Sequence, residues 1–455
     1  MDGGAAWELD EGGPVRTEVR GALGVLTLVA PPVNALTPPV RRALLLGLRD
    51  LAADPSVEAV ALAAEGRAFS AGLDVRELDA PDRPPSLRAL CDAVELFPKP
   101  IVAVLSGPAL GAGAELALAA RWRIGTGAAR MGFPDLALGL LPGGGGTQRL
   151  PRLVGAETAL RLLLGGRPEG AEALQATGLL DAVVTGDPVA GAGAFLREAA
   201  RRAGGRPTLP GATASLRAAA RARAALRPDQ AAERDLVDCV EASLLLPPAQ
   251  GLDFEAERHA ESLARPRARA LRRLFLAERR ASPALLRRTS NGAYEVTAAG
   301  EAIVERLGRA MGRAAGALAR GGTTREAVAR DLIDRALVDW GMPAGPFGGM
   351  EGGAGPDGPG LVRRVNAAVL AEAARLVAKG LASPEEVDAL AAAGLGVPRA
   401  SGGPVAMAEA EGLASLVRAM GAWAREDPAW SVPPLLAEAA TRRTLSPGAP
   451  PSPRT

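Results

Sequence analysis

The sequence predicts an α/β domain in the N-terminal half of the chain, followed by an all-α module of two similar helical units. Three observations predict this division. Strand-like apolar segments alternate with helical patterns up to about residue 144, which is typical of a layered α/β domain. Beyond that point the pattern is almost wholly helical. The 455 residues are also enough for two or three domains, each with its own core.

The N-terminal half alternates strand and helix signals. Strands are expected within residues 15–30 (two, joined at residues 22–24) and at residues 57–63, 101–105 and 122–124. Helices are expected at residues 38–51, with Thr37 as the cap, at residues 86–96, and from Ala112 onward. The expected α/β domain covers residues 13–250.

The C-terminal half contains a weak internal repeat. A helical run leads to GMPAGPF at residues 341–347, and a second one leads to GVPRASGGPV, so that Pro343 and Pro398 lie 55 residues apart. Two similar helical units would explain this spacing, although chance is the alternative in so Ala/Gly-rich a chain. The expected segments are a long charged linker helix within 251–290, a helical module at 291–442 with a loop at 343–360, and a disordered tail at 443–455.

Composition excludes several classes of function. The net charge is only +2 and no run of basic residues is interleaved with aromatic ones, so nucleic acid is not expected as a partner. No stretch of 18 apolar residues predicts a membrane span, and the N-terminus lacks a signal pattern. We therefore expect a cytoplasmic protein.

The rarest residue restricts the chemistry. His259 is the only histidine, so no histidine-rich metal site is possible, and no metal is expected. Its surroundings, FEAERHAESLARPRARALRRLF, predict a solvated helix face. Carboxylate chemistry is the remaining expectation.

Three segments place small residues where strands end: 66–74, 106–122 and 131–150. The helix from Ala112 begins with unpaired N–H groups, which can stabilise a developing oxyanion, each by about 3 kcal/mol of barrier. Glu115 lies in its first turn, and Asp135 follows 20 residues later, so that the two carboxylates could share one water or one proton.

Each of these features also has an ordinary structural explanation. Glu115 could be a first-turn acid that the helix dipole favours, Asp135 a turn residue, and the glycines at 143–146 a flexible loop. A dinucleotide fingerprint starting at Gly111 is disfavoured, because Leu116 occupies the place of its last glycine.

The sequence as a whole nevertheless resembles a known family. The motifs GRAFSAGLDVREL, IVAVLSGPALGAGAELALAARWRI, GFPDLALGLLPGGGGTQRLPRLVG and EALQATGLLDAVV together resemble the crotonase (enoyl-CoA hydratase/isomerase) superfamily, and within it the hydratase part of bacterial multifunctional fatty-acid oxidation proteins. This resemblance implies a crotonase-like ββα spiral and an acyl-CoA thioester as substrate.

The resemblance also implies roles for particular residues. Glu115 and Asp135 fall on the two catalytic acids, and the backbone N–H groups of Ala71 and Ala112 fall on the oxyanion hole. The implied substrate-binding residues are Gly72, Leu73, Asp74 and Gly111.

Two positions depart from the family pattern. Ala112 replaces the usual glycine, and Asp135 replaces a glutamate. The aspartate carboxylate lies roughly 1.5 Å further back, a displacement that can lower a rate about a hundredfold.

The C-terminal half resembles the linker helix and the paired helical domains of the same multifunctional proteins, but the NAD-binding domain between them is missing. The linker pattern ends near Ser282 and the first helical unit is under way by Gly300, whereas a Rossmann domain needs about a hundred residues or more. No NAD or other cofactor is therefore expected.

The function that the sequence predicts is enoyl-CoA hydration of the fatty-acid β-oxidation type. The alternatives are an enoyl-CoA double-bond isomerase, or a degenerate non-catalytic subunit that binds acyl-CoA or serves assembly. A homo-oligomer, or a subunit of a β-oxidation assembly, is the expected state.

Overall fold

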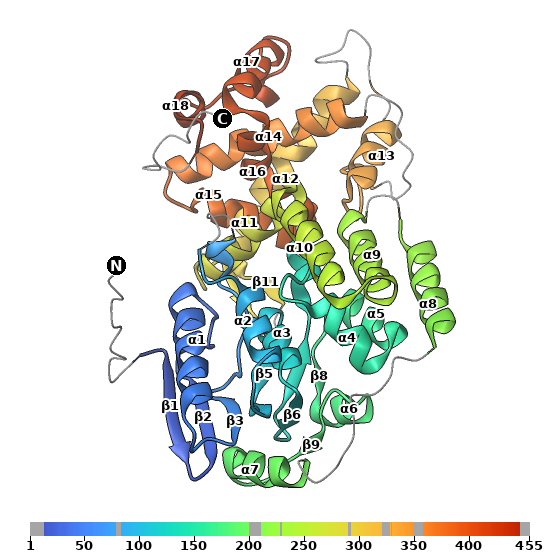
Figure 1. Ribbon diagram of the computed structural model, residues 1–455. Helices are drawn as coiled ribbons and strands as arrows, with labels where there is room; N and C mark the ends of the chain where they lie inside the picture. Colours follow the sequence, from blue (N-terminus) through green and yellow to red (C-terminus); the bar gives the residue numbers. More distant parts are fainter. Residues whose placement is uncertain are drawn as a thin grey trace, which may run out of the picture. The chain divides into compact units, whose positions relative to one another are not determined.

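The computed structural model describes residues 13–78, 83–199, 211–227, 230–289, 293–320, 328, 330–348 and 358–445. The chain forms two compact units, Met1–Arg265 and Pro266–Thr455 (Figure 1). The first unit extends past residue 250, so the division falls inside the segment expected to be a linker helix.

The first unit contains a six-stranded sheet in the order β1-β2-β3-β4-β6-β9 and a small second sheet in the order β5-β7-β8. The strands of the large sheet are β1 (Val15–Arg20), β2 (Leu23–Leu28), β3 (Ala59–Ala64), β4 (Ile101–Leu105), β6 (Trp122–Gly125) and β9 (Ala182–Val183). Those of the small sheet are β5 (Pro108–Leu110), β7 (Arg130–Gly132) and β8 (Glu169–Gly170). Only β1 pairs antiparallel within the large sheet. Its parallel strands are therefore apolar and buried on both faces, as Val60 and Val102 illustrate.

Helices surround these sheets (Figure 1). They are α1 (Pro38–Ala53), α2 (Leu87–Glu95), α3 (Ala112–Ala119), α4 (Gly146–Val154), α5 (Ala156–Gly165), α6 (Ala171–Ala176), α7 (Pro188–Ala199), α8 (Ala212–Ala225), α9 (Ala231–Leu245) and α10 (Pro248–Ala264). Two short 3₁₀ helices lie at Val75–Glu77 and Pro134–Leu138. All eight residues of α3 are buried, and Glu115 is one of them.

Several expected elements are confirmed, including β4 and the start of α3 at Ala112. Thr37 occupies the N-cap position of α1, but its side chain makes no capping hydrogen bond. The single long charged helix expected within 251–290 is wrong. It consists of α10 and α11, because Arg265 precedes Pro266 and adopts an extended conformation there.

The second unit is helical. Its helices are α11 (Pro266–Arg280), α12 (Ala298–Ala319), α13 (Arg330–Trp340), α14 (Gly358–Ala378), α15 (Pro384–Gly394), α16 (Pro404–Glu411), α17 (Leu413–Trp423) and α18 (Pro434–Arg442), with 3₁₀ turns at Arg399–Ser401 and Pro428–Trp430. One hairpin, β10 (Leu286–Arg288) and β11 (Tyr294–Val296), joins α11 to α12. The tail expected at 443–455 starts too early, because Leu445 is buried and the Thr444 hydroxyl donates to Glu409. Residues 446–455 lie outside the described residues.

The two Gly-x-Pro elements of the internal repeat pack against each other. Gly341 and Gly396 both have positive φ angles, +113° and +76°. A Cβ at Gly341 would lie 3.3 Å from Cγ of Pro398, and a Cβ at Gly396 would lie 2.7 Å from Cδ of Pro343. Each element thus covers the glycine of the other, which explains why the motif occurs twice.

This packing predicts that alanine destabilises the protein more at Gly396 than at a glycine with open space around it. Gly396→Ala should lower the free energy of unfolding by about 2–3 kcal/mol, because it adds a steric clash with Pro343 to the strain of a positive φ angle. Gly380→Ala is the matched control: its φ is +65° with nothing within 4 Å, so about 1 kcal/mol is expected. Urea unfolding of the full chain measures both, and equal losses would contradict the reciprocal packing.

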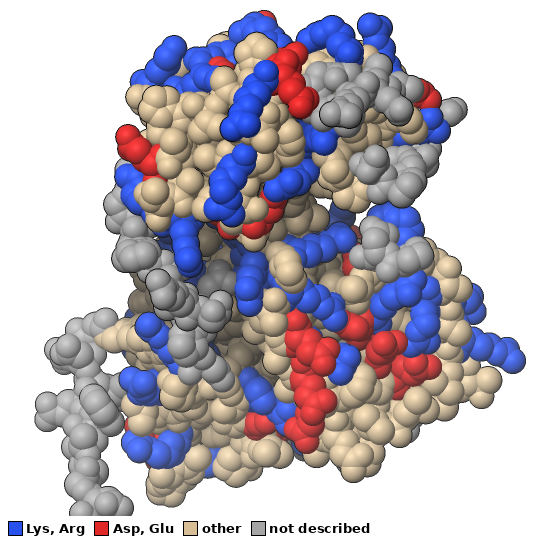
Figure 2. Space-filling model, turned by 90° about the horizontal axis from the view of Figure 1, so that it is seen from above, with Lys and Arg blue, Asp and Glu red and all other residues tan. Residues whose placement is uncertain are grey.

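The distribution of charged side chains on the surface agrees with the small net charge of the chain. On the face shown in Figure 2, Lys and Arg side chains lie among Asp and Glu side chains. Among the described residues, no helix is both long and apolar enough to cross a membrane.

Candidate active site

Glu115 lies in the first turn of α3 and is only 1% exposed. Its Oε1 accepts hydrogen bonds from the backbone N–H groups of Gly144 and Gly146, both at 2.8 Å. Among the described residues no donor bonds to Oε2. One carboxylate oxygen is therefore held in place, and the other is left without a hydrogen bond from these residues.

The glycine run at 143–146 is a packed turn and not a flexible loop. Gly145 has a φ of +100°, in the left-handed region. A Cβ at Gly146 would lie 2.9 Å from Oε1 of Glu115, and one at Gly143 would lie 2.7 Å from the ring of His259. Only glycine lets this backbone approach the acid so closely.

Asp135 lies in the 3₁₀ turn Pro134–Leu138, and its carboxylate faces the N-terminus of α3. A Cβ at Gly111 would lie 3.4 Å from Oδ1 of Asp135. Oδ2 is buried and has no hydrogen-bond partner among the described residues. Burial, and next the negative charge of Glu115, raise the pKa of Asp135 to about 7. The structure therefore places the two expected acids close enough for the charge of Glu115 to act on Asp135.

The backbone N–H groups at this site correct one prediction. The N–H of Ala71 donates to the carbonyl of Val33 at 2.9 Å, so it cannot also bind an oxyanion. Among the described residues, the N–H groups of Leu73 and Ala112 have no acceptor. The residue before Leu73 packs against the start of α3, because a Cβ at Gly72 would lie 3.2 Å from the Ala112 nitrogen. Leu73 replaces Ala71 as the candidate partner of Ala112.

The other residues expected to bind substrate have structural roles. Gly72 has a φ of +92°, and a Cβ there would lie 2.8 Å from the Leu110 carbonyl oxygen. The side chain of Asp74 caps the 3₁₀ helix that follows, accepting from the Arg76 N–H at 3.0 Å. These contacts shape the turn that presents Leu73.

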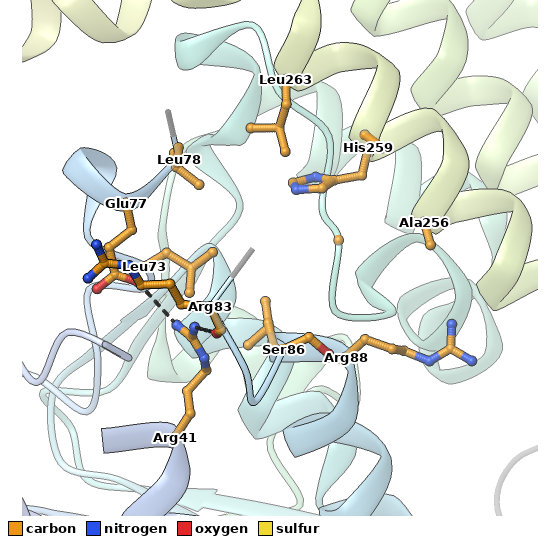
Figure 3. A pocket seen from close by; sticks show the side chains of 13 residues that line it. Arg41, Leu73, Glu77, Leu78, Arg83, Ser86, Arg88, Ala256, His259 and Leu263 are labelled. Atoms are coloured by element: carbon orange, nitrogen blue, oxygen red, sulfur yellow. Dashed lines mark hydrogen bonds and ion pairs between the residues drawn. The ribbon is translucent and has the colours of Figure 1, made fainter. Parts of the chain in front are cut away.

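A pocket of about 470 Å³ lies next to Leu73 and Gly143. This size is typical of ligand sites. Leu73 and Leu78 lie across it from His259 and Leu263 of α10 (Figure 3). It is lined by Arg41, Leu73, Glu77, Leu78, Arg83, Ser86, Leu87, Arg88, Gly143, Ala256, His259, Ala260 and Leu263. The expected solvated position of His259 is wrong: the side chain is half-buried, and its Nδ1 lies 2.6 Å from the Leu141 carbonyl oxygen.

Sequence reasoning missed Glu255, which is 1% exposed. Its carboxylate accepts from the N–H groups of Gly145, at 2.5 Å, and Thr147, at 2.8 Å, and from the Thr147 hydroxyl at 2.5 Å. Burial, and next the charge of Glu115, raise the pKa of Glu255 to about 8. Its spacing of four from His259 is the one sequence signal that could have placed it on the same helix face.

Metal ligands do not gather here. Within the part of the chain that the structure describes, no three His, Cys, Asp or Glu side chains form a group that could hold a metal ion.

Comparison with known families agrees with this architecture. Residues 18–235 match the family Enoyl-CoA hydratase/isomerase, and residues 361–446 match the family 3-hydroxyacyl-CoA dehydrogenase, C-terminal domain. The chain therefore carries a crotonase domain of the enoyl-CoA hydratase/isomerase family, followed by a 3-hydroxyacyl-CoA dehydrogenase C-terminal domain.

Individual relatives cover parts of the chain. The peroxisomal bifunctional enzyme of Homo sapiens is 36% identical over 276 residues, which are 58% of this chain and 38% of that protein. The peroxisomal bifunctional enzyme of Danio rerio is 44% identical over 165 residues, 36% of this chain and 23% of that protein. The chain thus spans less than two fifths of the length of these two relatives. A solved enoyl-CoA hydratase subunit from Geobacillus kaustophilus is 28% identical with a TM-score of 0.38, covering 58% of this chain and 95% of its own.

Proposed function

We propose that the N-terminal unit adds water across the double bond of a 2-enoyl-CoA thioester. The observation that supports this function best is the arrangement of Glu115. Two backbone N–H groups bind one of its oxygens, and among the described residues no donor binds the other. The acceptor-free N–H groups of Leu73 and Ala112 belong to the segments next to Gly72 and at the start of the same helix.

In the proposed reaction the N–H groups of Leu73 and Ala112 bind the thioester oxygen. Glu115 takes a proton from water as the water oxygen forms a bond to C3, and the electron pair of the double bond moves to give an enolate. Backbone donors aimed at the developing negative charge are a large catalytic contribution. Asp135 then gives a proton to C2. A pKa of about 7 lets Asp135 keep that proton near neutral pH, which suits a general acid.

The pocket supports a CoA thioester as the substrate. Arg41, Arg83 and Arg88 line it and could contribute positive charge for phosphate groups. Arg41 also pairs with Glu77 at 3.4 Å and Arg88 with Asp92 at 2.6 Å, so a phosphate would share these two side chains with carboxylates. Leu73 and Leu78 offer apolar contacts. Arg41 is buried and held by the carbonyl oxygens of Leu36 and Pro85.

The wild-type chain should convert crotonyl-CoA to 3-hydroxybutyryl-CoA with steady-state turnover, as measured by loss of enoyl thioester absorbance and by mass spectrometry. Conversion of a 3-enoyl-CoA to a 2-enoyl-CoA without hydration would favour the isomerase instead. No turnover of either substrate would favour a non-catalytic acyl-CoA-binding subunit.

We further propose that this chain performs no NAD-dependent oxidation. Only residues 281–297 separate α11 from α12, and within the described part of that interval the strands are β10 and β11. Formation of NADH from 3-hydroxybutyryl-CoA by the purified chain would contradict this proposal.

We also propose that the protein is a cytoplasmic enzyme, as the sequence predicts. The bifunctional enzymes of Homo sapiens and Danio rerio are peroxisomal by name, so the compartment expected from the sequence differs from theirs. A homo-oligomer, or a subunit of a β-oxidation assembly, is the proposed state, which light scattering on the purified chain can test.

A further inference from the structure

Four consecutive backbone N–H groups point alternately to two buried carboxylates. Those of Gly144 and Gly146 donate to Glu115, both at 2.8 Å. Those of Gly145 and Thr147 donate to Glu255, at 2.5 and 2.8 Å. The turn therefore lies between the two acids, and the bonds on one side constrain the donors on the other.

The carbonyl side of the same turn is also held. The guanidinium of Arg149 donates to the Gly144 carbonyl and is itself buried against Asp92 and Glu95, at 3.0 and 2.8 Å. The position of the two donors to Glu115 thus depends on partners outside the turn itself.

Glu255 acts from α10, a helix that lies more than a hundred residues further along the chain than the turn. One face of α10 follows residues 141–148. A Cβ at Gly145 would lie 2.9 Å from Leu252, and a Cβ at Gly251 would lie 2.3 Å from Oε1 of Gln148. One helical turn beyond Glu255, His259 reaches the Leu141 carbonyl. Leu252, Glu255 and His259 recur at helical spacing, so they lie on one face of α10. This face of α10 contacts the segment 141–148 from one end to the other.

We propose that Glu255 is a positioning residue for Glu115. By binding Gly145 and Thr147 it holds the turn in the conformation that directs the Gly144 and Gly146 N–H groups at Oε1 of Glu115. Oε2 of Glu115 then stays aimed at the reactant. This inference rests on the proposed hydratase function, although the effect on the turn can be measured without it.

The test is Glu255→Gln in the full chain. Glutamine offers a single acceptor oxygen and an NH₂ group that donates, so it cannot accept from both Gly145 and Thr147. We expect kcat for crotonyl-CoA hydration to fall about 10- to 100-fold, since a displacement of about 1 Å near the chemistry is enough for such a loss. KM should stay within about threefold, because Glu255 does not line the pocket. Glu257→Gln, an exposed glutamate on the same helix, is the matched control and should leave both constants unchanged.

Hydrogen exchange of the backbone provides a second readout that does not require turnover. Residues 143–148 should exchange faster in Glu255→Gln than in the wild type, and at the wild-type rate in Glu257→Gln. If Glu255→Gln does not fold, Thr147→Val should still raise exchange in this segment, because it removes the hydroxyl bond to Glu255. It also removes the bond that the Gln148 side-chain amide donates to the same hydroxyl, while Gln148 keeps its bond to the Cys239 carbonyl.

The outcomes separate the two proposals. A wild-type chain that hydrates no enoyl-CoA contradicts the proposed function, while faster exchange in Glu255→Gln still supports the positioning role. An active wild type with unchanged kcat in Glu255→Gln overturns the positioning role. Unchanged exchange of residues 143–148 in the folded variant also overturns it.

Discussion

Glu115→Gln should lower kcat for crotonyl-CoA hydration by about 10³-fold, within the range that a positioned general base contributes. The glutamine carbonyl can still accept from Gly144 and Gly146, so the turn should keep its conformation. The amide NH₂ then takes the place of Oε2, and an amide cannot accept a proton from water near neutral pH. Steady-state kinetics at saturating substrate measure the loss.

Two controls make this result specific to Glu115. Glu172→Gln removes an exposed carboxylate from α6 of the same unit and should leave kcat unchanged. The melting temperature of Glu115→Gln should not fall below that of the wild type, because both hydrogen bonds to the turn remain possible and the negative charge that raises the pKa of Asp135 and Glu255 is removed. A kcat within tenfold of the wild type would show that Glu115 is not the base.

The elements that the sequence predicted well are those whose signal is local. The strand Ile101–Leu105 is an apolar run bounded by Pro100 and Gly107, and the helix from Ala112 follows a glycine that turns the chain. The short strands β5, β7, β8 and β9 were missed. They have two or three residues each and exist only because a neighbouring strand supplies their hydrogen-bond partners.

The candidate site likewise contains residues that the sequence could identify and residues that only the tertiary fold identifies. Glu115 and Asp135 could be chosen from their positions in the sequence, and in the structure the charge of Glu115 acts on Asp135. The donor assigned to Ala71 was wrong because the carbonyl that occupies its N–H belongs to Val33, on a distant loop. Glu255 was missed for the same physical reason: it is 110 residues from Gly145, and only the tertiary fold joins them.

Asp135→Asn should reduce hydration about 10²-fold or more, because an amide can neither give a proton to C2 nor recover one from solvent. The same substitution should raise the stability of the folded chain at neutral pH, although it lowers activity. The pKa of Asp135 is raised from 3.8 to about 7 in the folded chain, so between these values the folded state keeps a proton that the unfolded state has lost. Stability therefore falls as pH rises through this window, and the full penalty is present above about pH 7.

Asparagine does not ionise, so the variant escapes this penalty. The melting temperature of Asp135→Asn should be close to that of the wild type near pH 4 and should exceed it increasingly up to about pH 7. Asp50→Asn, on the exposed surface of α1, should show no such pH-dependent gain. A constant difference across pH would mean that Asp135 ionises normally in the folded chain, and it could not then hold the proton that the second half of hydration requires. Joint loss of turnover and gain of stability above pH 7 would identify Asp135 as a carboxylate kept at the site for chemistry at the expense of folding free energy.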